Sequence, residues 1–376
     1  MAKIFGTNGG DNLLGLDNED DEIFGWPVGG SAATDIGNDT LRGLGGNDRL
    51  FGGGGDDFLI GDGGADIFTG GAGTDTVSYH TSSLAFGGVN VDLLMLRGEG
   101  GDAAGDTYGS VENVIGTASI DRITGDHADN LMYALEGDDI ISAQGGNDTL
   151  TGGAGADILS GGSGMDSASY HNSDGGIRVD LLLKAGRYFD AEGDLFGSIE
   201  NLNGSQFADN LFGDDAPNRI TANDGDDVIH GNGGNDEVDG GAGNDYLMGN
   251  DGDDVLFGRS GVDTMIGGGG VDRLVFTALA DSLVGTPDYI IVFETAHGDK
   301  VDLSDIDANV TVDGNQSFTF ISSAAFSGVA GQLRAVTNSQ QITVDADVNG
   351  DSVADFQLVV TVRIGGSQLA ETDFIL

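Results

Sequence analysis

The chain has no cysteine, and basic residues are scarce among its 376 residues. Without cysteine, neither a disulfide nor a thiolate metal site is available to stabilise it. Only 14 Lys and Arg stand against 63 Asp and Glu, which gives a formal net charge of −49. Binding to nucleic acid or to an anionic membrane surface needs clustered Lys and Arg, so we expect neither partner. Multivalent cations are the natural counterpart of this charge.

Long apolar runs are also missing. Nowhere do 18 apolar residues follow one another, so we expect no membrane span. The first ten residues, MAKIFGTNGG, lack a basic segment followed by an apolar run, and we expect no cleavable signal peptide. The protein is therefore expected to be soluble, and either cytosolic or exported by another route.

Glycine and aspartate are abundant instead. Glycine occupies 69 positions, and 53 of the 63 acidic residues are Asp, which favours turns and caps over helices. High charge with this much glycine is also typical of disordered chains. The 38% of hydrophobic residues and their strict period argue against disorder here.

That period is nine residues long, with the pattern G-G-x-G-x-D-x-U-x, where U is a large apolar residue. It fits three arrays, Thr34 to Ser78, Gly116 to Ser169 and Gly204 to Val275, without a slip of register. The stretch 1–33 carries looser copies and is predicted to be a cap. Eighth positions are almost all apolar. Sixth positions hold Asp39, Asp48, Asp57, Asp66, Asp75, Asp121, Asn130, Asp139, Asp148, Asp157, Asp166, Asp209, Asn218, Asp227, Asp236, Asp245, Asp254, Asp263 and Asp272.

The nineteen matched nonapeptides resemble the RTX, or haemolysin-type, calcium-binding repeats, and this resemblance implies a parallel β-roll. The residues support the same conclusion independently. Glycines permit a sharp turn with inward carbonyl oxygens, and positions seven to nine form a short strand with U buried. Two nonapeptides close one coil, so residues 18 apart stack on the same edge. Stacked carboxylates repel unless a cation lies between them, and calcium accepts such carboxylate and carbonyl oxygens. We therefore predict that every sixth-position Asp is a calcium ligand.

Two segments, 79–115 and 170–203, interrupt the arrays and are copies of one another. Both begin with a Tyr-His pair, at Tyr79 and Tyr170, and both carry a Val-Asp-Leu segment and a Gly-Asp pair. A Tyr-His pair near acids is one arrangement for acid and base catalysis on a polysaccharide. We favour the alternative that both inserts are wider coils of the same solenoid, with each Tyr in the core. Signatures of zinc proteases, serine hydrolases and phosphate-binding loops were sought and not found.

The last hundred residues lack the period. Alternating apolar segments at 288–294 and 356–364 predict strands. Residues 276–376 resemble the C-terminal domain of serralysin-type secreted proteases, notably in HGDKVDLSDID (297–307) and the closing DFIL. This resemblance implies export from a Gram-negative bacterium by a type I ABC transporter that reads a C-terminal signal. The protease domain has no counterpart here. A further calcium site, spaced like an EF-hand loop, is predicted at Asp345, Asp347, Asn349 and Asp351.

The sequence thus predicts an all-β protein: a cap at 1–33, a β-roll at 34–275 with two inserts, and an export domain at 276–376. We expect a secreted protein that folds on calcium binding outside the cell. It would act as an extracellular or cell-surface scaffold or adhesin, with an extracellular polysaccharide or a host surface as its partner. The alternative is an enzyme, or an accessory module of one, that acts on acidic polysaccharide in the manner of lyases and epimerases.

Overall fold

The computed structural model describes residues 2–16, 19–32, 35–82, 87–338, 341–362 and 368–376. The chain forms two compact units, residues 1–170 with 184–199, and residues 171–183 with 200–376. In the described residues of both units, the regular structure consists of β-strands and of 3₁₀ helices of three residues. No helix within these ranges is long and apolar enough to cross a membrane.

The strands of the first unit are mostly parallel and short. One sheet holds, in order, β1 (Lys3–Phe5), β3 (Glu22–Phe24), β5 (Arg49–Gly54), β7 (Ile67–Ala72) and β11 (Thr107–Gly109). A second holds β2 (Asn12–Leu14), β4 (Thr40–Gly45), β6 (Phe58–Gly63), β8 (Thr76–Ser78), β12 (Asn113–Ile115), β14 (Leu131–Glu136), β16 (Thr149–Ala154) and β18 (Ser167–Ser169). A third contains β9 (Asn90–Asp92), β13 (Arg122–Thr124), β15 (Ile140–Gly145), β17 (Ile158–Ser163) and β21 (Leu195–Gly197). Residues before Thr34 therefore continue the coils of the first array.

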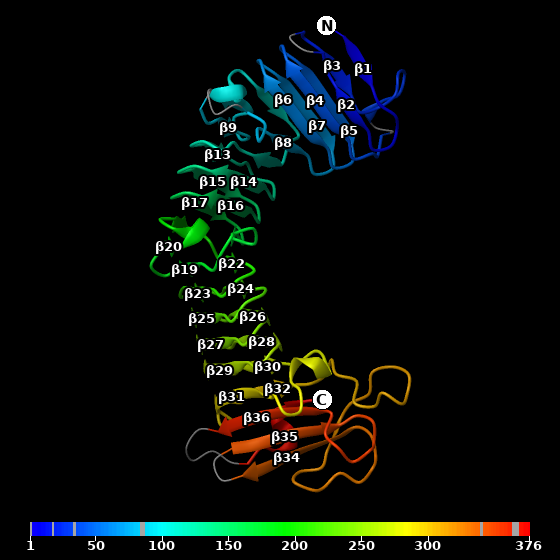
Figure 1. Ribbon diagram of the computed structural model, residues 1–376, viewed down its shortest axis with the longest axis vertical. Helices are drawn as coiled ribbons and strands as arrows, with labels where there is room; N and C mark the ends of the chain where they lie inside the picture. The colour runs from blue at the N-terminus through cyan, green and yellow to red at the C-terminus, as the bar shows by residue number, and fades with distance from the viewer. Residues whose placement is uncertain (1, 17–18, 33–34, 83–86, 339–340, 363–367) are drawn as a thin grey trace. The chain divides into compact units, whose positions relative to one another are not determined.

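The second unit repeats this plan and ends in an antiparallel segment (Figure 1). One sheet contains β19 (Arg178–Asp180), β23 (Asn210–Phe212), β25 (Val228–Gly233), β27 (Tyr246–Asp251), β29 (Thr264–Gly269) and β31 (Asp288–Phe293). It continues through β36 (Phe356–Val362), β35 (Gln341–Asp347) and β34 (Gln332–Asn338). The other contains β22 (Asn201–Asn203), β24 (Arg219–Thr221), β26 (Glu237–Ala242), β28 (Val255–Ser260), β30 (Arg273–Val275), β32 (Lys300–Asp302) and β37 (Phe374–Ile375). The predicted strands at 288–294 and 356–364 correspond to β31 and β36; residues 363–364 lie outside the described ranges.

Residues that pair across neighbouring parallel strands of the arrays are 18 apart in the sequence, which is twice the nonapeptide period. Leu247 pairs with Met265 across β27 and β29, and Leu256 pairs with Leu274 across β28 and β30. All four side chains are fully buried. Because strands alternate sides, the eighth position fills the interior while the seventh and ninth face outward. The prediction of an all-β parallel roll with two nonapeptides per coil is confirmed.

The close stacking of the turns requires glycine at position 252, the fourth position of its nonapeptide. Gly252 has a φ of 142°, and a Cβ there would lie 1.6 Å from the carbonyl oxygen of Gly234 in the preceding coil. Its N–H donates to the carbonyl oxygen of Gly269 in the following coil, at 2.8 Å. A side chain would separate these turns and break the contact.

The two inserts are wider coils of the roll, as the duplication indicated. Their Val-Asp segments form β9 and β19. Tyr79 and Tyr170 are 1% and 2% exposed, which confirms that they fill the core. The Tyr79 hydroxyl donates to Asp106 Oδ2 at 2.7 Å, and the Tyr170 hydroxyl donates to Asp194 Oδ2 at 2.6 Å. Each insert therefore closes around a buried phenol and carboxylate pair.

We expect the Tyr79→Phe variant to lower the free energy of unfolding by about 1 to 3 kcal/mol, because it removes the hydroxyl donor from the buried Asp106 carboxylate. Denaturant unfolding in saturating calcium measures this loss. Tyr246→Phe is the matched control, since the Tyr246 ring lies beside His230 on the outer face of β27. Equal stability of the two variants would contradict the assignment.

Candidate metal centre

Every predicted nonapeptide aspartate lies buried at the end of a turn, where the next strand begins. None of the seventeen is more than 2% exposed. In the third array, for example, Asp245 precedes β27 and Asp254 precedes β28. The glycine turn thus delivers each carboxylate to the inside edge of the coil, and the following apolar residue anchors it.

One oxygen of these carboxylates takes part in a ladder along each edge. The N–H of Asp227 donates to Oδ1 of Asp245 at 2.9 Å, and the N–H of Asp245 donates to Oδ1 of Asp263 at 2.9 Å. The same bond runs from Asp236 to Asp254 at 2.8 Å on the opposite edge. The ladder fixes each carboxylate relative to the coil before it, so the position of the second oxygen is set as well.

That second oxygen is buried and has no hydrogen-bond partner in the described part of the chain. This holds for Oδ2 of Asp39, Asp48, Asp57, Asp66, Asp75, Asp139, Asp148, Asp157, Asp227, Asp236, Asp245, Asp254, Asp263 and Asp272. Burying an ionised carboxylate oxygen without a partner lowers the free energy of unfolding, by on the order of several kcal/mol. Its repetition at one structural position indicates a ligand that supplies the missing positive charge.

Where the first position of a nonapeptide is glycine, as at Gly249, it leaves room for such a ligand. A Cβ at Gly249 would lie 2.2 Å from Asp254 Oδ2 and 2.6 Å from the carbonyl oxygen of Gly267. At Gly231 the corresponding distances are 2.2 Å to Asp236 Oδ2 and 2.8 Å to the carbonyl oxygen of Gly249. A carboxylate and a peptide carbonyl therefore bound the same small space. These oxygen donors suit calcium, and the nitrogen and sulfur ligands that zinc prefers are missing from this set.

The electrostatics of the calcium-free chain favour protonated carboxyls. Burial, with the charge of neighbouring aspartates, raises the pKa of Asp66 and of Asp227 to about 8. The same causes raise the pKa of Asp139 and Asp272 to about 7. A cation between the coils would reverse this preference and stabilise the ionised form.

Asp121 and Asp209, at the start of the second and third arrays, differ from the rest. Thr117 donates its N–H to Asp121 Oδ2 at 2.6 Å and its hydroxyl to Oδ1 at 2.9 Å. Ser205 makes the same two bonds to Asp209, at 2.7 and 2.8 Å. The repeat pattern predicts both as calcium ligands, but protein donors already reach both of their carboxylate oxygens, and we expect neither to be needed for an ion.

In the inserts, Asp106 and Asp194 belong to the ladder although no nonapeptide contains them. The N–H of Asp66 donates to Asp106 Oδ1 at 2.7 Å, and the N–H of Asp157 donates to Asp194 Oδ1 at 2.8 Å. Their second oxygens accept the tyrosine hydroxyls of the inserts. The Gly-Asp pair shared by both inserts was the available sequence signal for these positions.

Sequence reasoning also missed a second ladder, at the fifth position. The N–H of Val271 donates to Asp253 Oδ1 at 2.7 Å, and the N–H of Asp253 donates to Asn235 Oδ1 at 3.0 Å. This ladder runs in the opposite sense to the first, since each side chain accepts from the coil that follows. The frequent Asn and Asp at position five were the signal.

The structure does not bring the four predicted residues of the EF-hand-like loop together. Asp345 lies in β35 and forms an ion pair with Arg334 at 2.8 Å. Asp347, Asn349 and Asp351 accept backbone N–H groups within the turn that follows β35. The calcium site at this loop therefore stays a prediction, and its first residue is engaged elsewhere.

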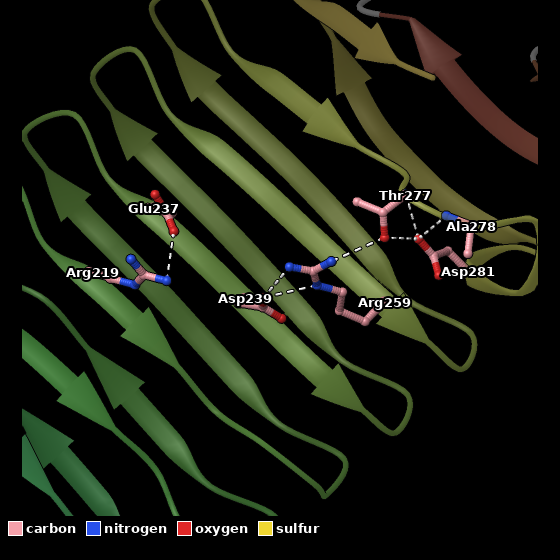
Figure 2. A network of polar contacts seen from close by, with 7 residues as sticks. All are labelled: Arg219, Glu237, Asp239, Arg259, Thr277, Ala278 and Asp281. Atoms are coloured by element: carbon pink, nitrogen blue, oxygen red, sulfur yellow. Dashed lines mark hydrogen bonds and ion pairs between the residues drawn. The ribbon is translucent and has the colours of Figure 1, made fainter. Parts of the chain in front are cut away.

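In the described ranges, no group of three or more His, Asp or Glu side chains is arranged as a metal cluster. The outer face of the third array instead pairs its charges with one another. Figure 2 shows Arg219 paired with Glu237, and Arg259 paired with Asp239 at 2.7 Å and bonded to Thr277 at 3.1 Å. A cation inside the coils would be held by two carboxylates and by peptide carbonyls.

The arrays match the model of a known repeat family. The sequence profile of the RTX calcium-binding nonapeptide repeat matches residues 34–68, 42–77, 107–141, 133–167, 203–238 and 239–274. No curated protein matches the chain. The chain is similar in part to the solution structure of the AlgE6R3 subunit from the Azotobacter vinelandii mannuronan C5-epimerase. That similarity has 20% identity and a TM-score of 0.27, over 46% of this chain and 80% of the other. The three arrays of this chain are RTX calcium-binding nonapeptide repeats.

Proposed function

We propose that the chain is a scaffold whose fold is switched on by calcium bound between neighbouring coils. The observation that supports this most directly is the row of buried carboxylate oxygens without partners along both edges of the arrays. Calcium would be held there by aspartate pairs 18 residues apart and by carbonyls such as that of Gly267. When bound, it would supply the positive charge that the interior lacks.

The thin core makes such ions necessary. Each coil buries only two eighth-position side chains, for example Leu247 and Leu256, and burial on this scale does not easily offset chain entropy. Extracellular calcium sites have a Kd of roughly 10⁻⁴ to 10⁻³ M, so each adds about 0.4 to 1.4 kcal/mol at millimolar calcium. At submicromolar calcium the same sites add close to nothing. The concentration difference across the cell envelope would then decide whether the arrays fold.

We further propose that the protein works outside the cell, exported by a type I ABC transporter. The support is the resemblance of residues 276–376 to the C-terminal domain of serralysin-type proteases. In this region β34, β35 and β36 form an antiparallel segment beside β31. An unfolded, calcium-free chain inside the cell suits passage through a transporter channel.

In this proposal, the folded solenoid acts as a cell-surface or extracellular scaffold or adhesin, and a polysaccharide or a host surface is its partner. The enzymatic alternative depends on the Tyr-His pairs of the inserts. Tyr79 and Tyr170 point into the core and are bonded to carboxylates, so their hydroxyls do not face a substrate. This placement favours the scaffold.

We expect calcium, but not magnesium at the same concentration, to convert a largely unfolded chain into one with strong β-sheet circular dichroism. Magnesium demands a tighter octahedral site than two fixed carboxylates and carbonyls offer. The titration uses the full chain after removal of metal with EDTA. Circular dichroism that is unchanged by EDTA and by calcium would refute the proposed function.

The calcium-free chain should gain stability as the pH falls from 7.5 to 5. Folding raises the aspartate pKa values from 3.8 to between about 6 and 8, so the folded form binds more protons than the unfolded form between about pH 4 and pH 8. Stability is therefore lost as the pH rises through these values. Circular dichroism in EDTA at the two pH values measures the effect as the fraction of folded chain, and a larger folded fraction at pH 7.5 would contradict it. With calcium present the trend should reverse, because protons compete with the ion.

Asp139→Asn should reduce the number of bound calcium ions, whereas Asp121→Asn should leave that number unchanged. Asp139 Oδ2 has no partner within the described residues, while both oxygens of Asp121 accept protein donors. The two residues are neighbours on one edge, joined by the bond from the Asp121 N–H to Asp139 Oδ1 at 2.7 Å. Equilibrium dialysis gives the count. An equal loss in both variants would show that the hydrogen bonds to Asp121 do not exclude a cation.

A further inference from the structure

The coil that follows the last nonapeptide keeps the aspartate ladder, although its sequence does not keep the repeat. The pattern ends at Val275, and residues 276–287 form an irregular loop with one 3₁₀ helix, η5 (Leu279–Asp281). β29 and β31 then pair with Thr264 opposite Tyr289 and Met265 opposite Ile290. This register places Asp288 opposite Asp263, at a separation of 25 residues in place of 18.

Asp288 has the same bonding as an aspartate of the arrays. The N–H of Asp263 donates to Asp288 Oδ1 at 2.9 Å. Both side chains are 0% exposed. Within the described residues, the second oxygen of each has no hydrogen-bond partner. Two fully buried carboxylates on neighbouring coils thus each present one oxygen that is not satisfied by the protein.

The surroundings of this pair add the negative charge of Asp281. Asp281, 7% exposed, is held in the loop by N–H groups of Thr277 and Ala278 on its Oδ2, at 2.7 and 3.0 Å (Figure 2). Burial, with the charges of Asp263 and Asp281, raises the pKa of Asp288 to about 8. None of the ion pairs found in the described residues includes Asp263 or Asp288.

The opposite edge of the same coil is closed by the protein itself. The N–H of Asp272 donates to Asp299 Oδ1 at 3.3 Å, which extends the sixth-position aspartate ladder of this opposite edge. Asp299 Oδ2, however, accepts the N–H of Glu294 at 2.7 Å. The inserts follow this closed arrangement too, with a tyrosine hydroxyl on Asp106 and on Asp194. At Asp106, Asp194 and Asp299, a protein donor reaches the second carboxylate oxygen. At Asp288, no donor from the described residues does so.

We propose that Asp263 and Asp288 bind a calcium ion between the last nonapeptide coil and the coil that follows it. The inference rests on the proposed function of the arrays and extends it to a residue that the repeat pattern does not mark. The site also has a structural consequence. Asp288 donates its N–H to the Ser282 hydroxyl at 2.8 Å, and that hydroxyl donates to the carbonyl oxygen of Gln357 in β36 at 2.6 Å. An ion at Asp288 would therefore stabilise the junction between the third array and the C-terminal strands.

The test counts calcium ions on the full chain by native mass spectrometry, for wild type, Asp288→Asn and Asp299→Asn. Asparagine keeps an oxygen that can accept the ladder bond from the Asp263 N–H. We expect Asp288→Asn to bind one ion fewer than wild type and Asp299→Asn to bind the same number. An unchanged count in Asp288→Asn would overturn the proposal.

A second measurement avoids any folding defect of the variants. Anomalous scattering from wild-type crystals grown in calcium should show an ion within about 2.6 Å of oxygens of both Asp263 and Asp288. Ions throughout the arrays with none at this pair would overturn the inference and leave the proposed function standing. A wild-type chain that binds no calcium at all would overturn both.

Discussion

The fold depends on how the repulsion between stacked, buried carboxylates is relieved. Parallel strands lie about 4.8 Å apart, so each edge of the roll brings aspartates together at a distance where like charges repel strongly. Interior apolar residues such as Leu247 and Leu256 form a core only two side chains wide per coil. Protons or cations along the edges would relieve this repulsion. Burial raises the aspartate pKa values to between about 6 and 8, so protonation at neutral pH is only partial, and in the proposed function calcium takes that role.

The second oxygen of the stacked carboxylates has three different surroundings in the structure. Within the arrays, one oxygen accepts the ladder N–H and the other is left for a cation, as at Asp245. In the inserts, a buried tyrosine hydroxyl takes the second oxygen, as Tyr170 does for Asp194. At Asp121 and Asp209 a preceding Thr or Ser supplies both an N–H and a hydroxyl. Coils that we propose to depend on the ion and coils with internal donors are thus built from the same ladder, and they differ in whether a protein donor reaches the second carboxylate oxygen.

Much of this arrangement follows from the sequence because the repeat period is also the geometric period. Leu256 was predictable as a core residue, and Asp254 as a stacked carboxylate at the coil edge, from their places in the nonapeptide. Residues outside the period were not: Asp106, Asp194 and Asp288 join the ladder across separations of 40, 37 and 25 residues. Because the loops between these residues differ in length, the stacked residues show no constant spacing in the sequence. Likewise, the partner of Asp345 is Arg334 on the neighbouring antiparallel strand, and only the pairing of β34 with β35 reveals it.

The central claim is that several calcium ions are bound by the folded form and released on unfolding. The most direct measurement is the free energy of unfolding by urea as a function of free calcium, from about 0.1 to 10 mM. Each ion released adds about 1.4 kcal/mol per tenfold rise in calcium once its site is saturated. We predict a slope that corresponds to several ions per chain. A free energy of unfolding that does not change with calcium would contradict the account.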